Sequence, residues 1–132
     1  MTTELLTEEN PADTITVSRV VSQPVKKVWS ALLTPAGQTA LLGEGAQLGD
    51  KGDSWQAADG SCGVTRSYHP LEQVRFSWRA DEFALRTMVT LNLIPDGDST
   101  TVQIIHTGLG ADLDREQLTA RWQNTVDFFA SI

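Results

Sequence analysis

The chain has 132 residues, a length typical of one domain, and its composition, with 40% hydrophobic and 20% charged residues, is that of a globular protein. Its formal net charge of −7 argues against a general binder of nucleic acids or of anionic membranes, because such proteins need a basic face. The one cysteine, Cys62, excludes an internal disulfide, and no apolar run approaches the length of a membrane span, so we expect a cytoplasmic protein.

The first third of the chain predicts an acidic arm, a strand and two short helices. Residues 1–13 are polar and acidic, lack the features of a signal peptide and are expected to form a flexible arm, so that a single domain covers 14–132. Residues 14–21 alternate between apolar and polar side chains and predict a strand. Helical spacing then predicts a helix over 25–32 with Ser22 as its cap, followed by a second short helix that begins at Thr34-Pro35.

A segment rich in glycine and aspartate follows, from Gly43 to Gly63. No Lys-Ser/Thr pair and no strand–helix context accompany its glycines, so they indicate turns and bulges of a curved sheet and not a phosphate-binding loop. Asp59-Gly60 predicts a hairpin turn. We expect three short strands here, over 46–48, 54–57 and 61–67.

The second half predicts an antiparallel meander and a long helix. Strands are expected over 73–80, 85–94 and 100–107, each alternating between an apolar and a partly polar face. The final segment begins near Asp112 or Asp114, and its residues Leu118, Trp122, Thr125 and Phe129 fall at i, i+4, i+7 and i+11 of one helical stripe. The predicted fold is therefore α+β, with a curved antiparallel sheet of about six to seven strands wrapped around a long C-terminal helix and two short helices after the first strand.

This order of elements, together with four sequence stretches, resembles the START-like or SRPBCC superfamily, which has the helix-grip fold of the birch pollen allergen. Within it, the chain is similar to the branch named for the activator of the heat-shock-protein-ninety ATPase. The stretches are VKKVWSALLTP at 25–35, the glycine-containing strand start at 51–55, PLEQVRFSW at 70–78 and VQIIHTGL at 102–109. The match covers 14–130 and consists mainly of packing residues, so it is more specific for the fold than for the biochemistry.

Two positions depart from the family pattern. After Pro35 the family often places aromatic residues, where this chain has Leu41, Leu42 and Gly43. Before the tryptophan of the last helix the family often has glycine, where this chain has Arg121. Both departures concern the two ends of the expected cavity.

The candidate site is a cavity between the sheet and the C-terminal helix. His106 shares a strand face with Ile104, where it either anchors a ligand or is a core histidine bonded to backbone or a hydroxyl, and the core interpretation is favoured by about two to one. Arg66 shares the parity of Val64 and, if it faces inward, needs an anion, although a structural or exposed arginine is favoured. The predicted lining comprises Trp29, Leu32, Arg66, Phe76, Trp78, Val89, Leu91, Ile104, His106, Trp122 and Phe129.

No Ser-His-Asp arrangement, paired carboxylates or metal-ligand spacing is visible, so we expect no catalytic residue, no metal and no cofactor. Cys62 is interpreted as a small hydrophobic residue and not as a nucleophile. The favoured function is a soluble binding protein that holds a hydrophobic or amphipathic small molecule in the cavity. The resemblance implies two alternatives: a chaperone-associated regulator, or a cyclase or isomerase on the same fold that would require His106 for turnover.

Overall fold

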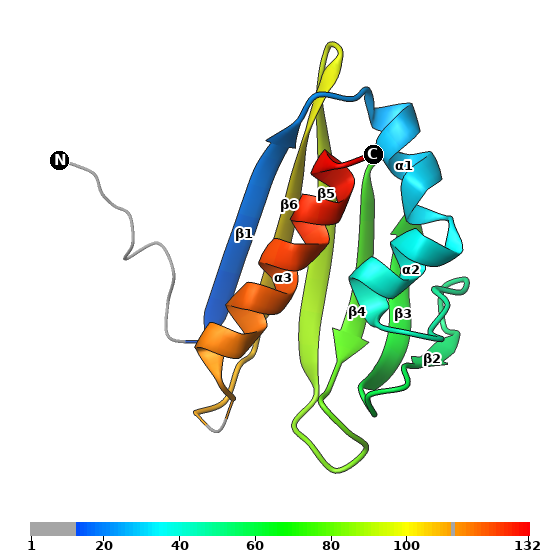
Figure 1. The fold of residues 1–132 in the computed structure, drawn as a ribbon. Coiled ribbons are helices and arrows are strands. Elements are labelled where there is room, and N and C mark those ends of the chain that lie inside the picture. The colour runs from blue at the N-terminus through cyan, green and yellow to red at the C-terminus, as the bar shows by residue number, and fades with distance from the viewer. Residues whose placement is uncertain (1–12, 112) are drawn as a thin grey trace, which may run out of the picture.

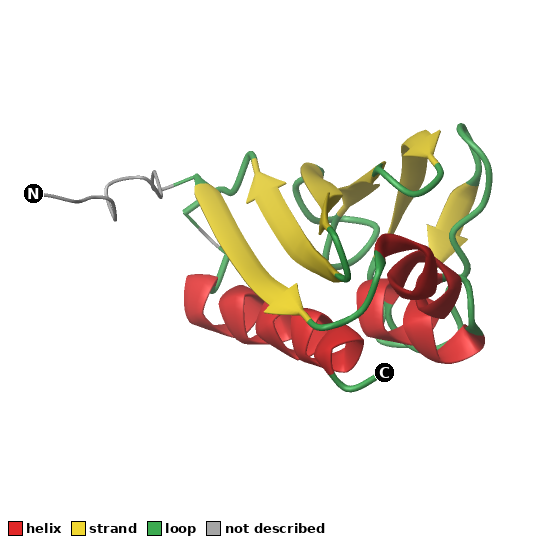
Figure 2. Ribbon diagram, turned by 90° about the horizontal axis from the view of Figure 1, so that it is seen from above, coloured by secondary structure: helices red, strands yellow, loops and turns green. Residues whose placement is uncertain are grey.

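One six-stranded antiparallel sheet carries three helices on one of its faces in the computed structural model, which describes residues 13–111 and 113–132 (Figures 1 and 2). The elements in chain order are β1 Thr14–Val21, α1 Val25–Leu32, α2 Pro35–Leu42, β2 Ser54–Gln56, β3 Cys62–His69, β4 Gln73–Trp78, β5 Thr87–Asp96, β6 Ser99–Thr107 and α3 Arg115–Ala130. The predicted α+β helix-grip architecture is thereby confirmed, with six strands. The acidic arm predicted over 1–13 lies almost wholly outside the described residues, and no described helix has the length and apolar character needed to cross a bilayer.

The strand order is β1-β6-β5-β4-β3-β2, so the first strand closes onto the last one. Ile15 pairs with His106 and Val17 with Ile104 across β1 and β6. Strands β5 and β6 are each bonded on both sides, whereas β1 and β2 form the edges of the sheet. Because side chains alternate along a strand, this register gathers the apolar residues of every strand on the face that the helices cover.

The helices cover the inner face in two parts. Helix α3 contacts β1 and β6, α1 contacts β5 and β6, and α2 packs against α1 and α3 (Figure 1). The predicted stripe of α3 is confirmed, because all four of its residues are buried against the sheet and α2. The side chain of Asp114 accepts a hydrogen bond from Gln117 N and begins the helix, as an N-cap aspartate does.

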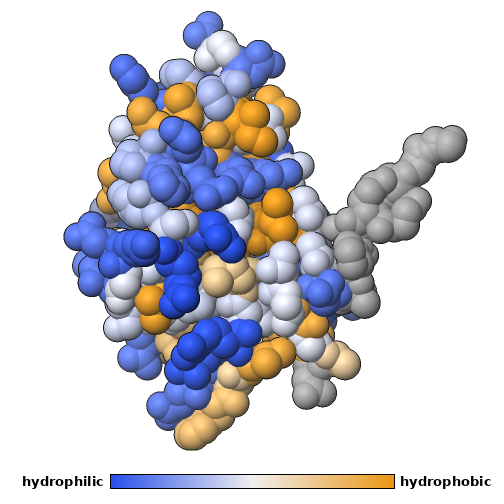
Figure 3. Space-filling model, turned by 180° about the vertical axis from the view of Figure 1, so that it is seen from behind, coloured by the Kyte–Doolittle hydropathy of each residue, from blue (hydrophilic) through white to orange (hydrophobic). Residues whose placement is uncertain are grey.

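The outer face of the sheet is largely hydrophilic and is broken by small apolar patches (Figure 3). A ladder of amide side chains crosses it, in which Gln73 Nε2 donates to Asn92 Oδ1 at 2.9 Å and Asn92 Nδ2 donates to Gln103 Oε1 at 3.0 Å. The sheet is therefore apolar on one side and polar on the other, as the alternation predicts.

Two local predictions are wrong. Helix α1 has Pro24 at its N-cap position and no side-chain cap, so Ser22 does not cap it. Residues 46–48 form no strand, because their amides bond to the neighbourhood of α2: Ala46 N donates to Gly43 O, and Leu48 N donates to Gln38 Oε1. The predicted cap of α2 is confirmed, since Thr34 Oγ1 accepts from Gly37 N at 3.0 Å.

Candidate functional site

A chain of four hydrogen-bonded groups crosses the centre of the interior. Trp122 Nε1 donates to His106 Nδ1 at 3.1 Å, and His106 Nε2 lies 2.7 Å from Thr87 Oγ1. Thr87 Oγ1 also donates its one hydrogen to the carbonyl of Trp78 at 2.7 Å. The threonine oxygen must therefore accept from His106, which assigns the neutral tautomer with its proton on Nε2. This uses both ring nitrogens of the histidine.

His106 is fully buried, and this determines its charge. Burial, and secondarily the positive charge of Arg121, lowers the pKa of His106 to about 4. The ring of Trp78 packs edge-on against it at 5.2 Å between centroids, and Trp122 does so at 5.7 Å. The imidazole is thus a neutral, hydrogen-bonded core group, and in this arrangement it offers no free nitrogen to a substrate or ligand.

All but one of the predicted lining residues lie together in the interior. The buried ones are Trp29, Leu32, Phe76, Trp78, Val89, Leu91, Ile104, His106, Trp122 and Phe129. The inward orientation considered for Arg66 is wrong, because the residue is exposed. Thr65 takes the inward position opposite Phe76, so the alternation of β3 places its neighbour Arg66 outward, where a β-bulge between Thr65 and Ser67 begins. That the buried residues contact a ligand stays a prediction.

Arg121 closes the interior where α2, α3 and the β2–β3 turn meet. Its guanidinium donates to the carbonyl of Leu42 at 3.0 Å and to Asp59 Oδ2 at 3.3 Å. It also lies over the rings of Trp78 and Trp122, at 5.6 and 5.4 Å from their centroids. A surface depression of about 440 Å³ between α2 and α3 has Arg121 in its lining.

The carboxylate of Asp59 is tuned by the same contact. Burial raises its pKa, but hydrogen bonds from Ser61 and Arg121 outweigh this and lower the pKa of Asp59 below its ordinary value. Arg121 stood out in the sequence only as a departure from the family pattern, which did not predict these contacts. The hydrogen-bond partners of Arg121 come from α2 and from a turn 62 residues away in the chain, and sequence spacing does not reveal such distant contacts.

Three inward-facing polar atoms on β2, β3 and β4, the half of the sheet away from β1, have no hydrogen-bond partner within the described residues. They are Trp55 Nε1 on β2, Thr65 Oγ1 on β3 and Trp78 Nε1 on β4. The ring of Trp55 packs edge-on against Phe76 at 5.8 Å. Buried polar groups are nearly always paired in folded proteins, so an unpaired set is where ordered water or the polar group of a ligand is expected.

Among the described residues, no three His, Cys, Asp or Glu side chains gather into a group that could hold a metal ion.

Thr87 is the member of the interior network that the sequence did not single out. The strand alternation placed it inward, but its contact with His106 depends on the pairing of β5 with β6, where Val89 lies opposite His106.

No protein-family model and no curated protein matches the sequence. Among solved structures, CalU16 from Micromonospora echinospora matches with a TM-score of 0.74 and 22% identity, over 89% of this chain and 71% of that one. An HSP90 activator from Plasmodium falciparum matches with a TM-score of 0.73 and 16% identity, over 88% of this chain and 92% of that one.

DynU16, a protein of the dynemicin biosynthetic locus, matches with a TM-score of 0.75 and 23% identity, over 92% of this chain. This chain spans about half of the length of DynU16, since it covers 47% of it. At these identities the likeness is one of fold. The chain has the START-like, or SRPBCC, helix-grip fold, as its sequence stretches indicated.

Proposed function

We propose that the protein binds an apolar or amphipathic small molecule with an acidic group between the sheet and α3, at the end that Arg121 closes. The observation that carries this proposal is the buried indole Nε1 of Trp78, which has no hydrogen-bond partner in the described residues. The Arg121 guanidinium lies over the same indole ring, 5.6 Å from its centroid. An N–H donor and a cation thus stand together at the edge of an aromatic interior. A carboxylate or similar group can accept from both.

The interactions that hold Arg121 in place are weak enough to be exchanged. Its ion pair with Asp59 spans 3.3 Å, and the Asp59 side chain is 54% exposed. Pairs of this kind contribute about 0–1 kcal/mol, so the acidic group of a ligand can replace Asp59 at little cost. The apolar body of the ligand would then lie against Trp78 and Trp122, which also provide most of the dispersion contacts.

The lining side chains form one buried core cluster, so binding requires α2 to separate from α3. No backbone–backbone hydrogen bond joins these two helices within the described residues. They are linked by two bonds from α3 side chains, from Arg121 to Leu42 O at 3.0 Å and from Thr125 Oγ1 to Ala40 O at 2.6 Å. Opening at this seam therefore breaks no secondary structure, in keeping with the small barriers of lid-like motions.

The test compares two fluorescent probes, the anionic anilinonaphthalene sulfonate and the uncharged phenylnaphthylamine. We expect saturable binding of both. Arg121→Gln should weaken the anionic probe about tenfold and leave the uncharged probe within about twofold, because only the charge-assisted bond is lost. Arg75→Gln, on the outer face, is the matched control with the same change of charge. The proposal fails if neither probe saturates, or if the two arginine variants behave alike.

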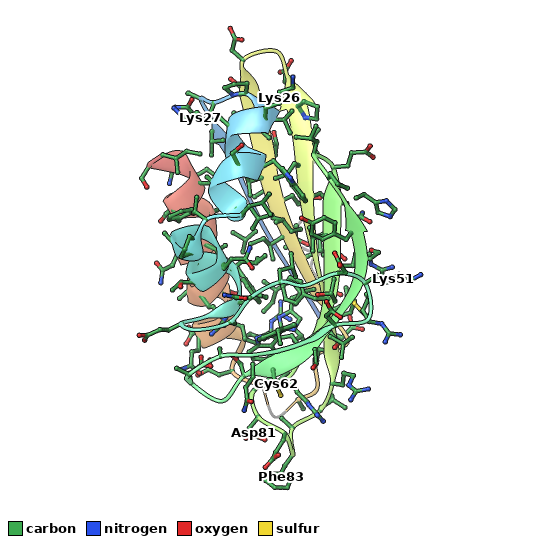
Figure 4. The ribbon with its side chains drawn as sticks, turned by 90° about the vertical axis from the view of Figure 1, so that its right-hand side faces the viewer. Lys26, Lys27, Lys51, Cys62, Asp81 and Phe83 are labelled. Atoms are coloured by element: carbon green, nitrogen blue, oxygen red, sulfur yellow. The ribbon has the colours of Figure 1, made fainter. Side chains whose placement is uncertain are left out.

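A second candidate function is regulation of a chaperone, which the likeness to an HSP90 activator supports. The structural observation in its favour is the β4–β5 loop, where Phe83 is 89% exposed and Leu85 is 57% exposed. Figure 4 shows Phe83 at the tip of this loop, pointing away from the domain. Exposed apolar side chains at a tip are what a protein partner would bury.

This candidate is tested with the cognate HSP90-type chaperone. We expect co-purification and a changed ATPase rate with the wild-type protein, and loss of both with Phe83→Ser. Leu33→Ser, which changes another exposed apolar residue far from the loop, should keep both activities. A wild-type protein that neither binds the chaperone nor alters its ATPase removes the candidate.

A further inference from the structure

We propose that the outer face of the sheet holds a second binding site, which takes the carboxylate or phosphate group of a small molecule in a depression beside Cys62. The depression has a volume of about 360 Å³. Its lining includes Cys62, Val64, Ser77, Arg79, Glu82 and Arg86, from β3, β4 and the segment that leads into β5. It opens on the face opposite α3 and is therefore distinct from the interior site.

Strand pairing brings Cys62 and Arg79 together. Cys62 N donates to Arg79 O at 3.1 Å, and Arg79 N donates to Cys62 O at 3.0 Å. Directly opposed residues of an antiparallel pair project their side chains from the same face, and the neighbouring Trp78 points inward, so this pair points outward. Arg86 immediately precedes the inward-facing Thr87 and lines the same depression.

The depression carries local positive charge in an acidic protein. The guanidinium groups of Arg79 and Arg86 make no ion pair with any residue in the ranges 13–111 and 113–132. Glu82 contributes the one acidic side chain of the lining, so two cations face one anion. Unpaired arginines are planar, permanently charged forks that match the geometry of carboxylate and phosphate oxygens.

The lysines do not explain this charge. Figure 4 places Lys26 and Lys27 at the opposite end of the molecule from Cys62, and Lys51 points away from the body of the domain. Cys62 lies at the end of the sheet from which the β4–β5 loop projects. The most hydrophilic side chains of the outer face gather on the side away from the N-terminal strand (Figure 3). The lysines therefore contribute no charge to the depression, whose cations are Arg79 and Arg86.

Ser77 supplies a polar group at the base of the depression. It is only 2% exposed, and its Oγ accepts from Val64 N at 2.9 Å. Its hydroxyl hydrogen is donated to no acceptor in the described part of the chain. A buried hydroxyl with an unused donor, next to two unpaired guanidinium groups, forms a set of donors and cations suited to an oxyanion.

Cys62 makes this site measurable, because it is the one cysteine of the chain. Its reaction rate is compared for two thiol reagents, the anionic disulfide dithiobis-nitrobenzoate and the uncharged N-ethylmaleimide. We expect Arg79→Gln and Arg86→Gln each to slow the anionic reagent about two- to fivefold and to leave the maleimide rate unchanged, as the loss of one exposed charge predicts. Arg75→Gln, on the same face outside the lining, is the control and should change neither rate.

A second arm identifies the anion. Inorganic phosphate and benzoate are added separately at constant ionic strength, and we expect at least one of them to slow maleimide labelling of the wild-type protein but not of Arg86→Gln. Protection by phosphate alone assigns a phosphate group, and protection by benzoate alone assigns a carboxylate. If neither anion protects Cys62, or if Arg75→Gln has the effect of Arg86→Gln, the proposal is overturned. Arg86→Gln should bind anilinonaphthalene sulfonate as the wild type does, because this probe reports on the interior site. The two proposals can therefore fail separately.

Discussion

At the scale of single residues, the interior is organised by a directed series of hydrogen bonds that runs from Trp122 through His106 and Thr87 to the carbonyl of Trp78. Each donor has one acceptor, so the series fixes the tautomer of the histidine. Such a network stabilises a fold only while every member is paired, because an unpaired polar group at this depth is costly. This makes its members sensitive to small chemical changes.

Protonation of His106 should destabilise the fold. Its pKa is lowered from 6.5 to about 4 in the folded protein, so between these values the unfolded chain binds more protons, and stability falls as the pH falls. We expect the free energy of unfolding in urea to be about 2 kcal/mol lower at about pH 5 than at about pH 7. His106→Gln should flatten this dependence, and His69→Gln, at an exposed position, should preserve it. An unchanged slope in His106→Gln would contradict the assignment.

Replacing Thr87 by valine should lower the free energy of unfolding, although the two side chains have nearly the same shape. The change leaves His106 Nε2 without an acceptor and Trp78 O without the hydroxyl donor. We expect urea unfolding to show a loss of about 1–3 kcal/mol. Thr90→Val, on the half-buried outer face of the same strand, is the matched control and should change stability by less than about 0.5 kcal/mol. Equal effects at both positions would rule out the hydrogen-bond explanation.

At the scale of elements, α2 shows how packing overrides helix propensity. Gly37 lies inside this helix, where alanine is intrinsically better by about 1 kcal/mol. A Cβ atom at this position, however, would lie 2.0 Å from the carbonyl oxygen of Ala31 and 2.7 Å from that of Leu32. The glycine therefore allows α2 to start directly against the end of α1.

We accordingly expect Gly37→Ala to destabilise the protein by about 1–3 kcal/mol, because the overlap with backbone atoms cannot be relieved by a rotamer change. Thr39→Ala, at an exposed position of the same helix, should be neutral or stabilising by a few tenths of a kcal/mol. Thermal or urea unfolding of both variants measures the difference. A Gly37→Ala variant as stable as the wild type would mean that the two helices are not in this contact.

At the scale of the whole molecule, the two halves of the sheet differ in how firmly they are held. Strands β5 and β6 pair on both sides over long stretches, whereas β2 has three residues and one neighbour. Helix α3 packs on β1 and β6 of the first half. The half with the three unpartnered polar atoms is therefore the one with fewer backbone restraints.

Amide hydrogen exchange should reproduce this division. We expect amides within β5 and β6 to exchange only through global unfolding and those of β2 to exchange at least about tenfold faster through local opening. Mass spectrometry of peptides covering each strand gives the comparison. Protection of β2 equal to that of β5 would contradict the local weakness of this half of the sheet.

The sequence alone was sufficient for much of the fold. The order of elements, the inward set of strand residues, the cap at Thr34 and the stripe of α3 follow from periods of two and 3.6 residues and from short-range hydrogen bonding. These are local properties, so each can be read from neighbouring positions. They also placed nearly all of the candidate lining in the interior, because burial follows the same alternation.

Only the tertiary structure decided how those residues meet. Thr65 and not Arg66 faces the interior from β3, and residues 46–48 bond toward α2 and not to a strand. The contacts of His106 with Thr87 and Trp122 depend on strand register and helix placement, and Arg121 gained its role from Leu42 and Asp59. Such contacts join positions far apart in the chain, and their geometry is set by packing of the whole domain, which no local pattern encodes.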